Sequence, residues 1–341
     1  MNASVHQVEL VFCDGVTQTI TASSGQSLLD AAVAANVAVM HQCRSGSCSS
    51  CIAQLTDGTT SKLAGSSSTL LTSEYDAGQR LLCVCQAESD CRLTLSYSSA
   101  AAAVTAGTAH AFINSIESIA DDVVRLRLEL AEGSWMKFQP GQYVQIEVPG
   151  CGQLRSYSPY STAEQLPYMD FMIRIQPLGV MSEWLRQHAE VDQVLTLTGP
   201  YGAFFLRPEH KRKPHIFIAG GTGLAPVLSM IDSLRNQGGL RPPVLLSFGC
   251  SSAASLFGIE DIRLRQRWMP NLDARVCVSR EAVPGCLQQN LLDAISPNDI
   301  KPDSVAYLCG PPAMVEAATQ KLLQHGVAAD HIYSEPFVAS H

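Results

Sequence analysis

The chain has 341 residues, enough for two or three domains of about 100 to 200 residues each. Hydrophobic residues make up 46% and charged residues 16%, a composition typical of globular proteins and not of disordered or fibrous ones. The formal net charge of −8 disfavours nucleic acid as a partner, because phosphate binding needs clustered Lys and Arg, and the only short run is Lys211-Arg212-Lys213.

The sequence shows no targeting or membrane signal. It has no positively charged leader followed by an apolar segment, and no run of about 18 apolar residues. We therefore expect a cytoplasmic protein. In that reducing compartment its 12 cysteines should be thiols or metal ligands.

The first third predicts a small α+β domain over residues 1–97. Two strand-like segments, 8–15 and 17–22, meet near the turn pair Asp14-Gly15. A helix is expected over 27–36, because apolar residues recur there at helical spacing, with Ser24 or Ser27 as its cap.

The rest of the chain predicts two further domains. Residues 98–110 are mostly small and read as a linker. Residues 111–206 alternate apolar and polar positions between turn signals, which predicts an antiparallel β-barrel. Residues 207–341 contain four strand-like segments, each expected to precede a helix, which predicts a doubly wound parallel sheet: 216–219, 244–249, 274–279 and 305–310.

A cysteine-rich loop follows the first predicted helix. Cys43, Cys48 and Cys51 have the spacing C-x4-C-x2-C, which is that of a plant-type 2Fe-2S site with a distant fourth cysteine. A zinc site usually offers two C-x2-C pairs and only one is present, but zinc or a redox dithiol remains an alternative. Cys83 and Cys85 are the candidates for the fourth ligand.

Residues 1–97 resemble a plant-type ferredoxin, in CRSGSC and SSC at the loop and in LLCVCQAESD at the return. The resemblance implies a β-grasp fold and, from the register of Ser89-Asp90, Cys83 as the fourth ligand, with Cys85 in a packing role. That family usually has Gly at the position of Ser49. Because hydrogen bonds to cluster sulfurs raise the reduction potential, we expect one nearby hydroxyl to tune it: Ser45, Ser47, Ser49 or Ser50.

The middle domain carries three motifs that together resemble the ferredoxin-NADP reductase superfamily: RSYS at 155–158, GVMS at 179–182 and GPYGAFF at 199–205. Arg155 can grip a flavin pyrophosphate with two hydrogen bonds, and Gly179 and Ser182 precede a helix whose N–H groups can meet the same phosphates. The resemblance implies that Tyr157 stacks on the flavin ring and that Ser158 contacts it. The remaining expected cofactor contacts are Ser156, Arg174, Val180 and Met181.

In the last domain a glycine-rich turn between a strand and a helix can admit a pyrophosphate, and GGTGLAP resembles the nicotinamide nucleotide site of the same superfamily. The expected contacts there are Gly221, Thr222, Gly223, Ala225 and Pro226. The segment Cys309-Gly310-Pro311 and the terminal Glu335 and Phe337 resemble the residues around the nicotinamide ring. The catalytic residues implied by the resemblance are thus Ser158, Cys309, Glu335 and Phe337.

The choice between NADH and NADPH rests on two segments. Residues 248–257 contain no Arg or Lys that could bind a 2′-phosphate, which favours NADH. Residues 278–281, with Arg280, resemble the segment that holds this phosphate in plant-type reductases. We predict NADH, with NADPH possible.

The order of the modules resembles the reductase components of bacterial aromatic-ring-hydroxylating oxygenases. The resemblance implies electron flow from NADH through FAD and a 2Fe-2S cluster to a Rieske-type terminal oxygenase, directly or through a separate ferredoxin. A diiron monooxygenase or a deoxysugar dehydratase is an alternative partner. An alternative of another class is a flavin reductase with a zinc-stabilised docking domain.

Overall fold

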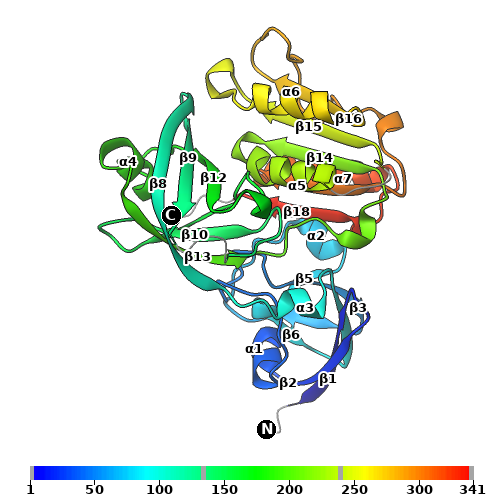
Figure 1. Cartoon of the computed structure of the whole chain (residues 1–341). Helices are drawn as coiled ribbons and strands as arrows, with labels where there is room; N and C mark the ends of the chain where they lie inside the picture. The colour runs from blue at the N-terminus through cyan, green and yellow to red at the C-terminus, as the bar shows by residue number, and fades with distance from the viewer. Residues whose placement is uncertain (1–3, 132–135, 237–240, 338–341) are drawn as a thin grey trace. The chain divides into compact units, whose positions relative to one another are not determined.

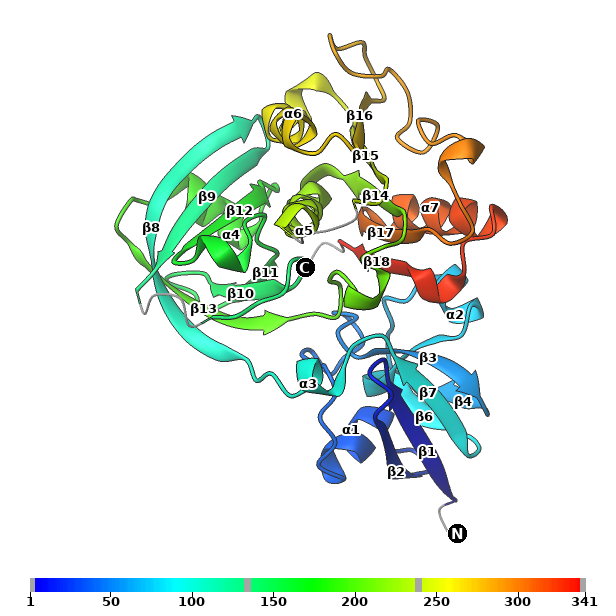
Figure 2. The ribbon, with the colours of Figure 1, turned by 45° about the vertical axis from the view of Figure 1, so that its right-hand side comes forward.

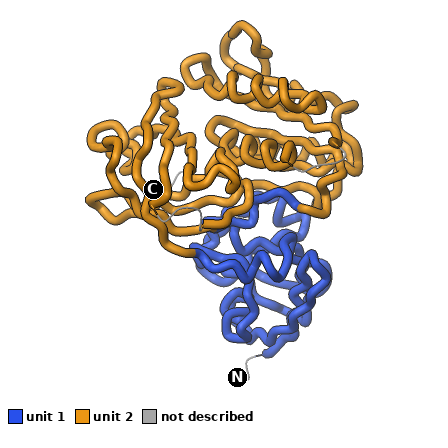
Figure 3. Tube along the Cα trace, in the orientation of Figure 1, with its two compact units in different colours: residues 1–106, 201–207 blue, residues 107–200, 208–341 orange. Residues whose placement is uncertain are grey.

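The computed structural model describes residues 4–131, 136–236 and 241–337 (Figure 1). The chain forms two compact units, residues 1–106 with 201–207 and residues 107–200 with 208–341 (Figure 3). The sequence places 201–206 in the flavin domain and 207 in the nucleotide domain, whereas in the structure Ala203 and Phe205 lie in the hydrophobic core of unit 1. Within the described residues no helix combines the length and the apolar character that a membrane span needs.

Unit 1 is built on a mixed sheet with the strand order β2-β1-β7-β3-β5. The hairpin expected around Asp14-Gly15 is present, and β1 also pairs in parallel with β7, so the first and last strands of the unit lie side by side. The elements of the sheet are β1 (Val5–Phe12), β2 (Thr17–Ser23), β3 (Ile52–Asp57), β5 (Gln79–Leu81) and β7 (Cys91–Leu95). A second, two-stranded sheet and a short helix complete it: β4 (Thr60–Lys62), β6 (Cys85–Ala87) and α2 (Thr72–Asp76).

Helix α1 (Leu28–Ala34) begins where the sequence predicts it. The hydroxyl of Ser27 accepts a hydrogen bond from the Asp30 N–H at 3.0 Å, which caps the helix. Its apolar face is buried against the sheet. After Asn36, whose φ of 55° breaks the helical path, the chain runs without regular secondary structure to β3. The cysteine loop occupies that stretch.

The segment 98–110, expected to be a linker, contains regular structure. Ser98 caps a single helical turn, α3 (Ser99–Ala102), which the run of alanines favours because alanine has the highest helix propensity. The first strand of the barrel then begins at Gly107.

The first half of unit 2 is an antiparallel sheet with the order β11-β10-β13-β8-β9-β12. A bridge between Pro159, just past β11, and Phe171 of β12 joins its two ends, so the sheet closes into the expected barrel. Its elements are β8 (Gly107–Ala120), β9 (Val123–Leu130), β10 (Tyr143–Glu147), β11 (Leu154–Tyr157), β12 (Tyr168–Arg174), β13 (Val194–Tyr201) and the helix α4 (Val180–Gln187).

The second half of unit 2 is a fully parallel sheet with the order β16-β15-β14-β17-β18. The order reverses at β14, as a doubly wound sheet requires, and the helices pack along its strands (Figure 2). The elements are β14 (His215–Gly220), β15 (Val244–Cys250), β16 (Leu272–Val278), β17 (Val305–Gly310), β18 (Ile332–Pro336), α5 (Leu224–Asn236), α6 (Ile259–Trp268) and α7 (Pro312–Gln324).

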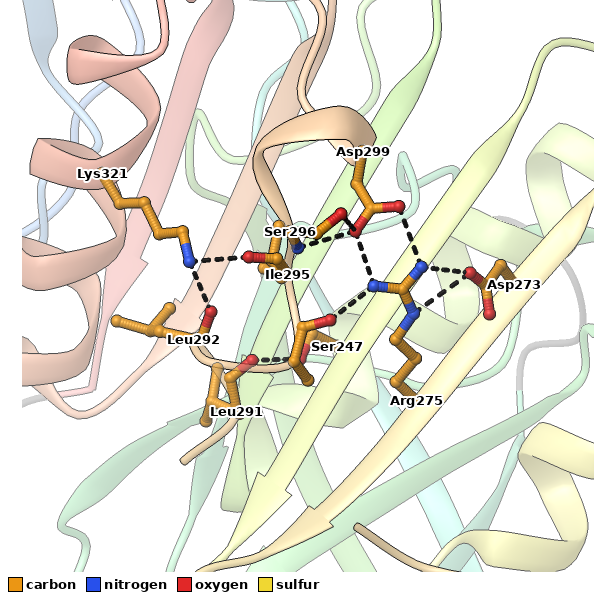
Figure 4. A network of polar contacts seen from close by, with 10 residues as sticks. Ser247, Asp273, Arg275, Leu291, Leu292, Ile295, Ser296, Asp299 and Lys321 are labelled. Atoms are coloured by element: carbon orange, nitrogen blue, oxygen red, sulfur yellow. Dashed lines mark hydrogen bonds and ion pairs between the residues drawn. The ribbon is translucent and has the colours of Figure 1, made fainter. Parts of the chain in front are cut away.

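One expected helix is absent: β16 is followed by a loop over 279–300 with a single 3-10 turn, Pro297–Asp299. Backbone carbonyls that a helix would satisfy internally are bound here by side chains from β15, β16 and α7 (Figure 4). Ser247 donates to Leu291 at 2.6 Å, Lys321 to Leu292 and Ile295 at 2.7 Å each, and Arg275 to Ala294. Arg275 also pairs with Asp273 and Asp299, both at 2.6 Å. The prediction of a helix after every strand was therefore wrong at β16.

Candidate functional site

The structure brings together the sulfurs of four cysteines. Cys43, Cys48 and Cys51 lie on the loop before β3, and Cys83 lies on the 3-10 turn Leu82–Val84. The Cys43 sulfur contacts those of Cys48 and Cys83, and the Cys51 sulfur contacts that of Cys83. These shared hydrogen bonds lower the pKa of Cys43 and raise the pKa of Cys83.

Backbone N–H groups surround these sulfurs. The N–H groups of Ser45 and Ser47 donate to the Cys43 sulfur at 3.4 and 3.3 Å, and the N–H of Cys43 lies 3.5 Å from the Cys48 sulfur. The Gly46 N–H donates to Cys83. Such donors stabilise thiolates, which are the ligands of iron-sulfur clusters, so the residues present fit a 2Fe-2S group.

The four sulfurs form a chain of contacts: Cys43 touches both Cys48 and Cys83, and Cys83 also touches Cys51. Across the described ranges, no group of three His, Cys, Asp or Glu side chains is arranged to hold a single metal ion. A plant-type cluster takes four thiolates, two on each of its irons, so this set of four sulfurs matches its demand.

Cys85 lies apart from this group. Its side chain is buried, burial raises the pKa of its thiol, and its sulfur hydrogen-bonds the Gln86 carbonyl at 3.8 Å. The structure therefore joins Cys83, and not Cys85, to the other three cysteines.

The four serines near the sulfurs differ in their contacts. The hydroxyls of Ser45 and Ser47 contact Cys43, and that of Ser50, a residue only 1% exposed, bonds the Cys48 sulfur. Ser49 has a φ of 52°, in the left-handed region, and its hydroxyl lies 3.2 Å from that of Thr69. The backbone at Ser49 thus has the conformation that favours the glycine of related ferredoxins.

The expected flavin residues lie at the end of β11. Arg155 donates to the Gln153 side chain at 2.7 Å and to the Leu154 carbonyl at 3.0 Å, so its guanidinium lies along its own strand edge. Ser156 is exposed and Tyr157 is partly buried. Ser158, the residue directly after the strand, is buried.

The start of α4 has no side-chain cap within the part of the chain that the structure describes. Gly179 precedes the helix and has no side chain to accept from the first-turn N–H groups, which leaves room for a ligand to do so. The buried Ser182 hydroxyl accepts from the Gln176 N–H at 2.9 Å and keeps its own proton for donation. Met181 packs in the barrel core and Val180 is partly buried, so these two can offer backbone groups more readily than side chains.

Arg174 reaches from β12 to the glycine-rich turn after β14. It pairs with Asp122 at 3.0 Å, and a Cβ at Gly221 would lie 3.0 Å from its guanidinium nitrogen. A cation thus lies beside the turn at which we expect the nucleotide pyrophosphate.

Two turns at the carboxyl edge of the parallel sheet touch each other. A Cβ at Gly223 would lie 2.3 Å from the Cys309 carbonyl oxygen, and one at Gly310 would lie 3.0 Å from the Gly220 nitrogen. Glycine is therefore required for this approach. Beyond Gly223, Ala225 and Pro226 lie buried in the first turn of α5, while Thr222 and Pro311 remain accessible.

Cys309 and Glu335 are directly opposite each other on β17 and β18. Cys309 is fully buried, and burial raises the pKa of Glu335 to about 8. Burial and the neighbouring Glu335 raise the pKa of the Cys309 thiol. Although Glu335 is partly exposed as a residue, its Oε2 is buried and has no hydrogen-bond partner among the described residues, so a polar ligand group would fit there.

Phe337 follows directly: its N–H donates to the Gly310 carbonyl at 2.8 Å, and the residue is 38% exposed. Cys309, Gly310, Glu335 and Phe337 therefore form one group. Ser158 belongs to the barrel, and within the described residues no hydrogen bond joins it to that group.

Comparison with known proteins matches each part of this architecture. A 2Fe-2S iron-sulfur cluster binding domain matches residues 11–88, an oxidoreductase FAD-binding domain residues 110–206, and an oxidoreductase NAD-binding domain residues 217–320. The toluate 1,2-dioxygenase electron transfer component of Pseudomonas putida is 33% identical over 339 residues, 98% of this chain and 99% of that protein. The chain belongs to the family of oxygenase reductase components.

Relatives of this reductase serve different oxygenases. The reductase component of propane 2-monooxygenase from Mycolicibacterium goodii is 31% identical over 92% of both chains. Among solved structures, the Amycolatopsis cytochrome P450 reductase superposes with a TM-score of 0.72 at 28% identity, covering 97% of this chain and 99% of that one. The ferredoxin reductase in carbazole 1,9a-dioxygenase gives 0.66 at 26%, covering 98% and 99%.

The matches confirm the resemblance drawn from the motifs, the fold class and the three cofactors. The reductase is an oxidoreductase with 2Fe-2S, FAD and NAD domains in that order. The alternative of a zinc-stabilised docking domain does not fit the match to a 2Fe-2S domain. The roles of single residues remain predictions.

Proposed function

We propose that this reductase takes a hydride from NADH and passes its two electrons, one at a time, to a Rieske-type oxygenase that hydroxylates aromatic rings. The observation that carries the proposal is the contact among the Cys43, Cys48, Cys51 and Cys83 sulfurs in a chain with flavin and nucleotide domains. When bound, FAD would supply the conversion from a two-electron to a one-electron donor, and Cys43, Cys48, Cys51 and Cys83 would hold the 2Fe-2S cluster that serves as the one-electron carrier.

The residues of the barrel would hold FAD. Arg155 is free to exchange its weak contacts along β11 for a phosphate, since a charge-assisted pair is stronger than a bond to an amide. The uncapped start of α4 and the spare proton of Ser182 would bind the same pyrophosphate. The ring of Tyr157, which is already partly buried, supplies an apolar face for the flavin.

The carboxyl edge of the parallel sheet would hold NADH. The turn Gly221–Gly223 admits the pyrophosphate beside Arg174, and Cys309 and Glu335 border the nicotinamide. With its raised pKa, the carboxyl of Glu335 holds a proton at neutral pH, so the pocket keeps no negative charge that would retain the positively charged NAD⁺. We infer that this neutrality aids product release.

The partner is proposed from the relatives. The electron transfer components of toluate and anthranilate dioxygenases align with 98% of this chain, and the propane 2-monooxygenase reductases with 92%. A monooxygenase is therefore the second candidate partner. Because the reductase has its own 2Fe-2S domain as a one-electron carrier, we propose direct transfer to the oxygenase. We also propose a cytoplasmic location, because thiols and metal-bound cysteines persist in that reducing compartment.

An anaerobic titration tests this function. The purified protein should show iron-sulfur absorbance bands in addition to those of the flavin, about two irons per FAD, and bleaching of both on addition of NADH. NADPH should reduce it more slowly. A flavin-only spectrum would overturn the electron path, and failure to reduce a Rieske-type oxygenase without an added ferredoxin would overturn direct transfer.

A further inference from the structure

The segment Ser67–Thr69 lies against the cysteine loop. The Thr69 N–H and hydroxyl both donate to the Gly46 carbonyl, at 2.9 and 3.1 Å, and the Ser67 hydroxyl donates to the Ser45 carbonyl at 3.2 Å. Gly46 has a φ of 79°, and a Cβ there would lie 2.3 Å from the Ser67 carbonyl oxygen. The two segments therefore touch along their backbones.

Each of these carbonyls belongs to a peptide group whose N–H binds a cysteine sulfur. The Gly46 carbonyl shares its peptide plane with the Ser47 N–H, which donates to Cys43 at 3.3 Å. In a trans peptide the C=O and N–H point in opposite directions, so fixing the oxygen fixes the direction of the N–H. Thr69, by holding the oxygen with two donors, aims the Ser47 N–H at the sulfur.

The preceding peptide group repeats the arrangement. The Ser45 carbonyl, bound by Ser67, shares its plane with the Gly46 N–H, which donates to the Cys83 sulfur. Hydrogen bonds in series also polarise one another, so a donor on the carbonyl strengthens the bond that the N–H makes. Two hydroxyls outside the cysteine motif thus act on two different sulfurs.

We propose that Ser67 and Thr69 are positioning residues that set the reduction potential of the cluster by orienting the Gly46 and Ser47 N–H groups onto Cys83 and Cys43. The proposal rests on the proposed role of the four cysteines as cluster ligands. One-electron reduction adds negative charge to the cluster, and N–H donors to its sulfurs stabilise that charge. Loss of either hydroxyl should therefore make the potential more negative.

The test is a redox titration of the full-length holoprotein followed by electron paramagnetic resonance of the cluster. We expect Thr69→Val and Ser67→Ala each to lower the equilibrium constant for cluster reduction about tenfold, which corresponds to about 59 mV for one electron. Thr69→Ser, which keeps the hydroxyl, should restore the wild-type potential. Iron, sulfide and flavin contents should stay the same in all variants.

Two neighbouring serines provide matched controls. The Ser66 hydroxyl donates to the Leu63 carbonyl at 2.7 Å and that of Ser68 accepts from the Leu70 N–H at 3.2 Å, so neither reaches the cysteine loop. Ser66→Ala and Ser68→Ala should leave the potential unchanged. If Thr69→Val fails to assemble a cluster, Ser67→Ala decides, because it keeps both bonds from Thr69.

Wild-type potentials in Ser67→Ala, or in Thr69→Val where its cluster assembles, would overturn the positioning role. So would equal shifts in the two control variants, since these would show a general effect of the segment. A wild-type protein without any 2Fe-2S signal would instead overturn the proposed ligands, so the two failures can be told apart.

Discussion

The cysteine loop of unit 1 and the carboxyl edge of the parallel sheet in unit 2, where we propose that the nicotinamide binds, are built in opposite ways. Three of the four clustered cysteines fall within residues 43–51, and their sulfurs are surrounded by N–H groups of the same stretch. At the sheet edge, Gly223, Cys309 and Glu335 lie at or just after the ends of three different strands and are far apart in sequence. The first site depends on local backbone conformation, the second on the register of a parallel sheet.

This difference predicts different responses to substitution. In the loop, loss of a cysteine should prevent the cluster from being bound, whereas changes at the neighbouring residues should only shift its reduction potential. At the sheet edge, a change at one strand end displaces groups on another, because β14, β17 and β18 are paired there.

The largest effect is expected at Cys83. Cys83→Ser removes the thiol that contacts both Cys43 and Cys51, so it should abolish electron transfer to cytochrome c while hydride transfer from NADH to FAD continues. Stopped-flow absorbance with NADH and a steady-state cytochrome c assay measure the two steps separately.

Cys85→Ser is the matched control, two residues further along the chain. The Cys85 thiol donates to the Gln86 carbonyl and is not part of the group of four sulfurs. We therefore expect the cluster spectrum and cytochrome c reduction to be retained. The reverse outcome, loss with Cys85→Ser and retention with Cys83→Ser, would show that the ligand assignment is wrong.

A smaller but still large effect is expected at Gly223. In Gly223→Ala the new Cβ would meet the Cys309 backbone oxygen at 2.3 Å, so the two turns must separate. We expect about 1–3 kcal/mol lower stability and weaker NADH binding, with an unchanged cluster potential. Calorimetry and NADH titrations measure these quantities.

Gly220→Ala is the control, because its Cβ would meet the flexible Met314 side chain and the Pro311 ring. It should lower stability and NADH binding less than Gly223→Ala does. An equal loss in both variants would argue against the specific contact with Cys309.

Glu335 gives the sheet edge a pH dependence. Its folded pKa of about 8 lies above the usual 4.5, so between these values the folded protein holds a proton that the unfolded chain has released. The contribution to stability is fully present below pH 4.5 and is lost as pH rises to about 8, at about 1.4 kcal/mol per unit of pKa difference.

Glu335→Gln cannot ionise, so its melting temperature should exceed that of the wild type increasingly as pH rises from about 5 to about 8. Differential scanning calorimetry across this range measures the gap. A constant gap would mean that the Glu335 carboxyl does not titrate in the apolar environment described here.

Much of the fold could be predicted because it follows from local patterns. Alternation identified the barrel strands, Ser27 marked the start of α1, and the C-x4-C-x2-C spacing identified the cluster type. The loop at 279–300 could not be predicted, because its backbone is satisfied by Arg275 and Lys321 from elements outside it. The helix at Ser99–Ala102 was missed because small residues were read as linker although alanine favours helix.

The candidate sites show the same limit. Sequence spacing named three of the cysteines, and the resemblance to ferredoxins named the fourth. Nothing in a serine-rich stretch distinguishes Ser67 and Thr69 from their neighbours, and only the folded chain shows which hydroxyls reach the loop. Likewise, the sequence could name Arg174 as a cofactor contact but could not show that it pairs with Asp122 beside Gly221.

The smallest effect is expected at Ser49, which stands at the position where plant-type ferredoxins usually have glycine. Ser49→Gly relieves a left-handed conformation that costs a non-glycine residue about 1–2 kcal/mol, and loses one hydrogen bond to Thr69 worth about 1 kcal/mol, so stability should change by no more than about 1 kcal/mol. Its hydroxyl does not reach a sulfur, so the cluster potential should stay at the wild-type value.

Ser50→Ala, which removes the hydroxyl bonded to Cys48, should make the potential more negative. Redox titrations of the two variants side by side compare them directly. An equal shift in both would mean that the conformation of the loop, and not the hydroxyl on the sulfur, governs the potential at this end of the cluster.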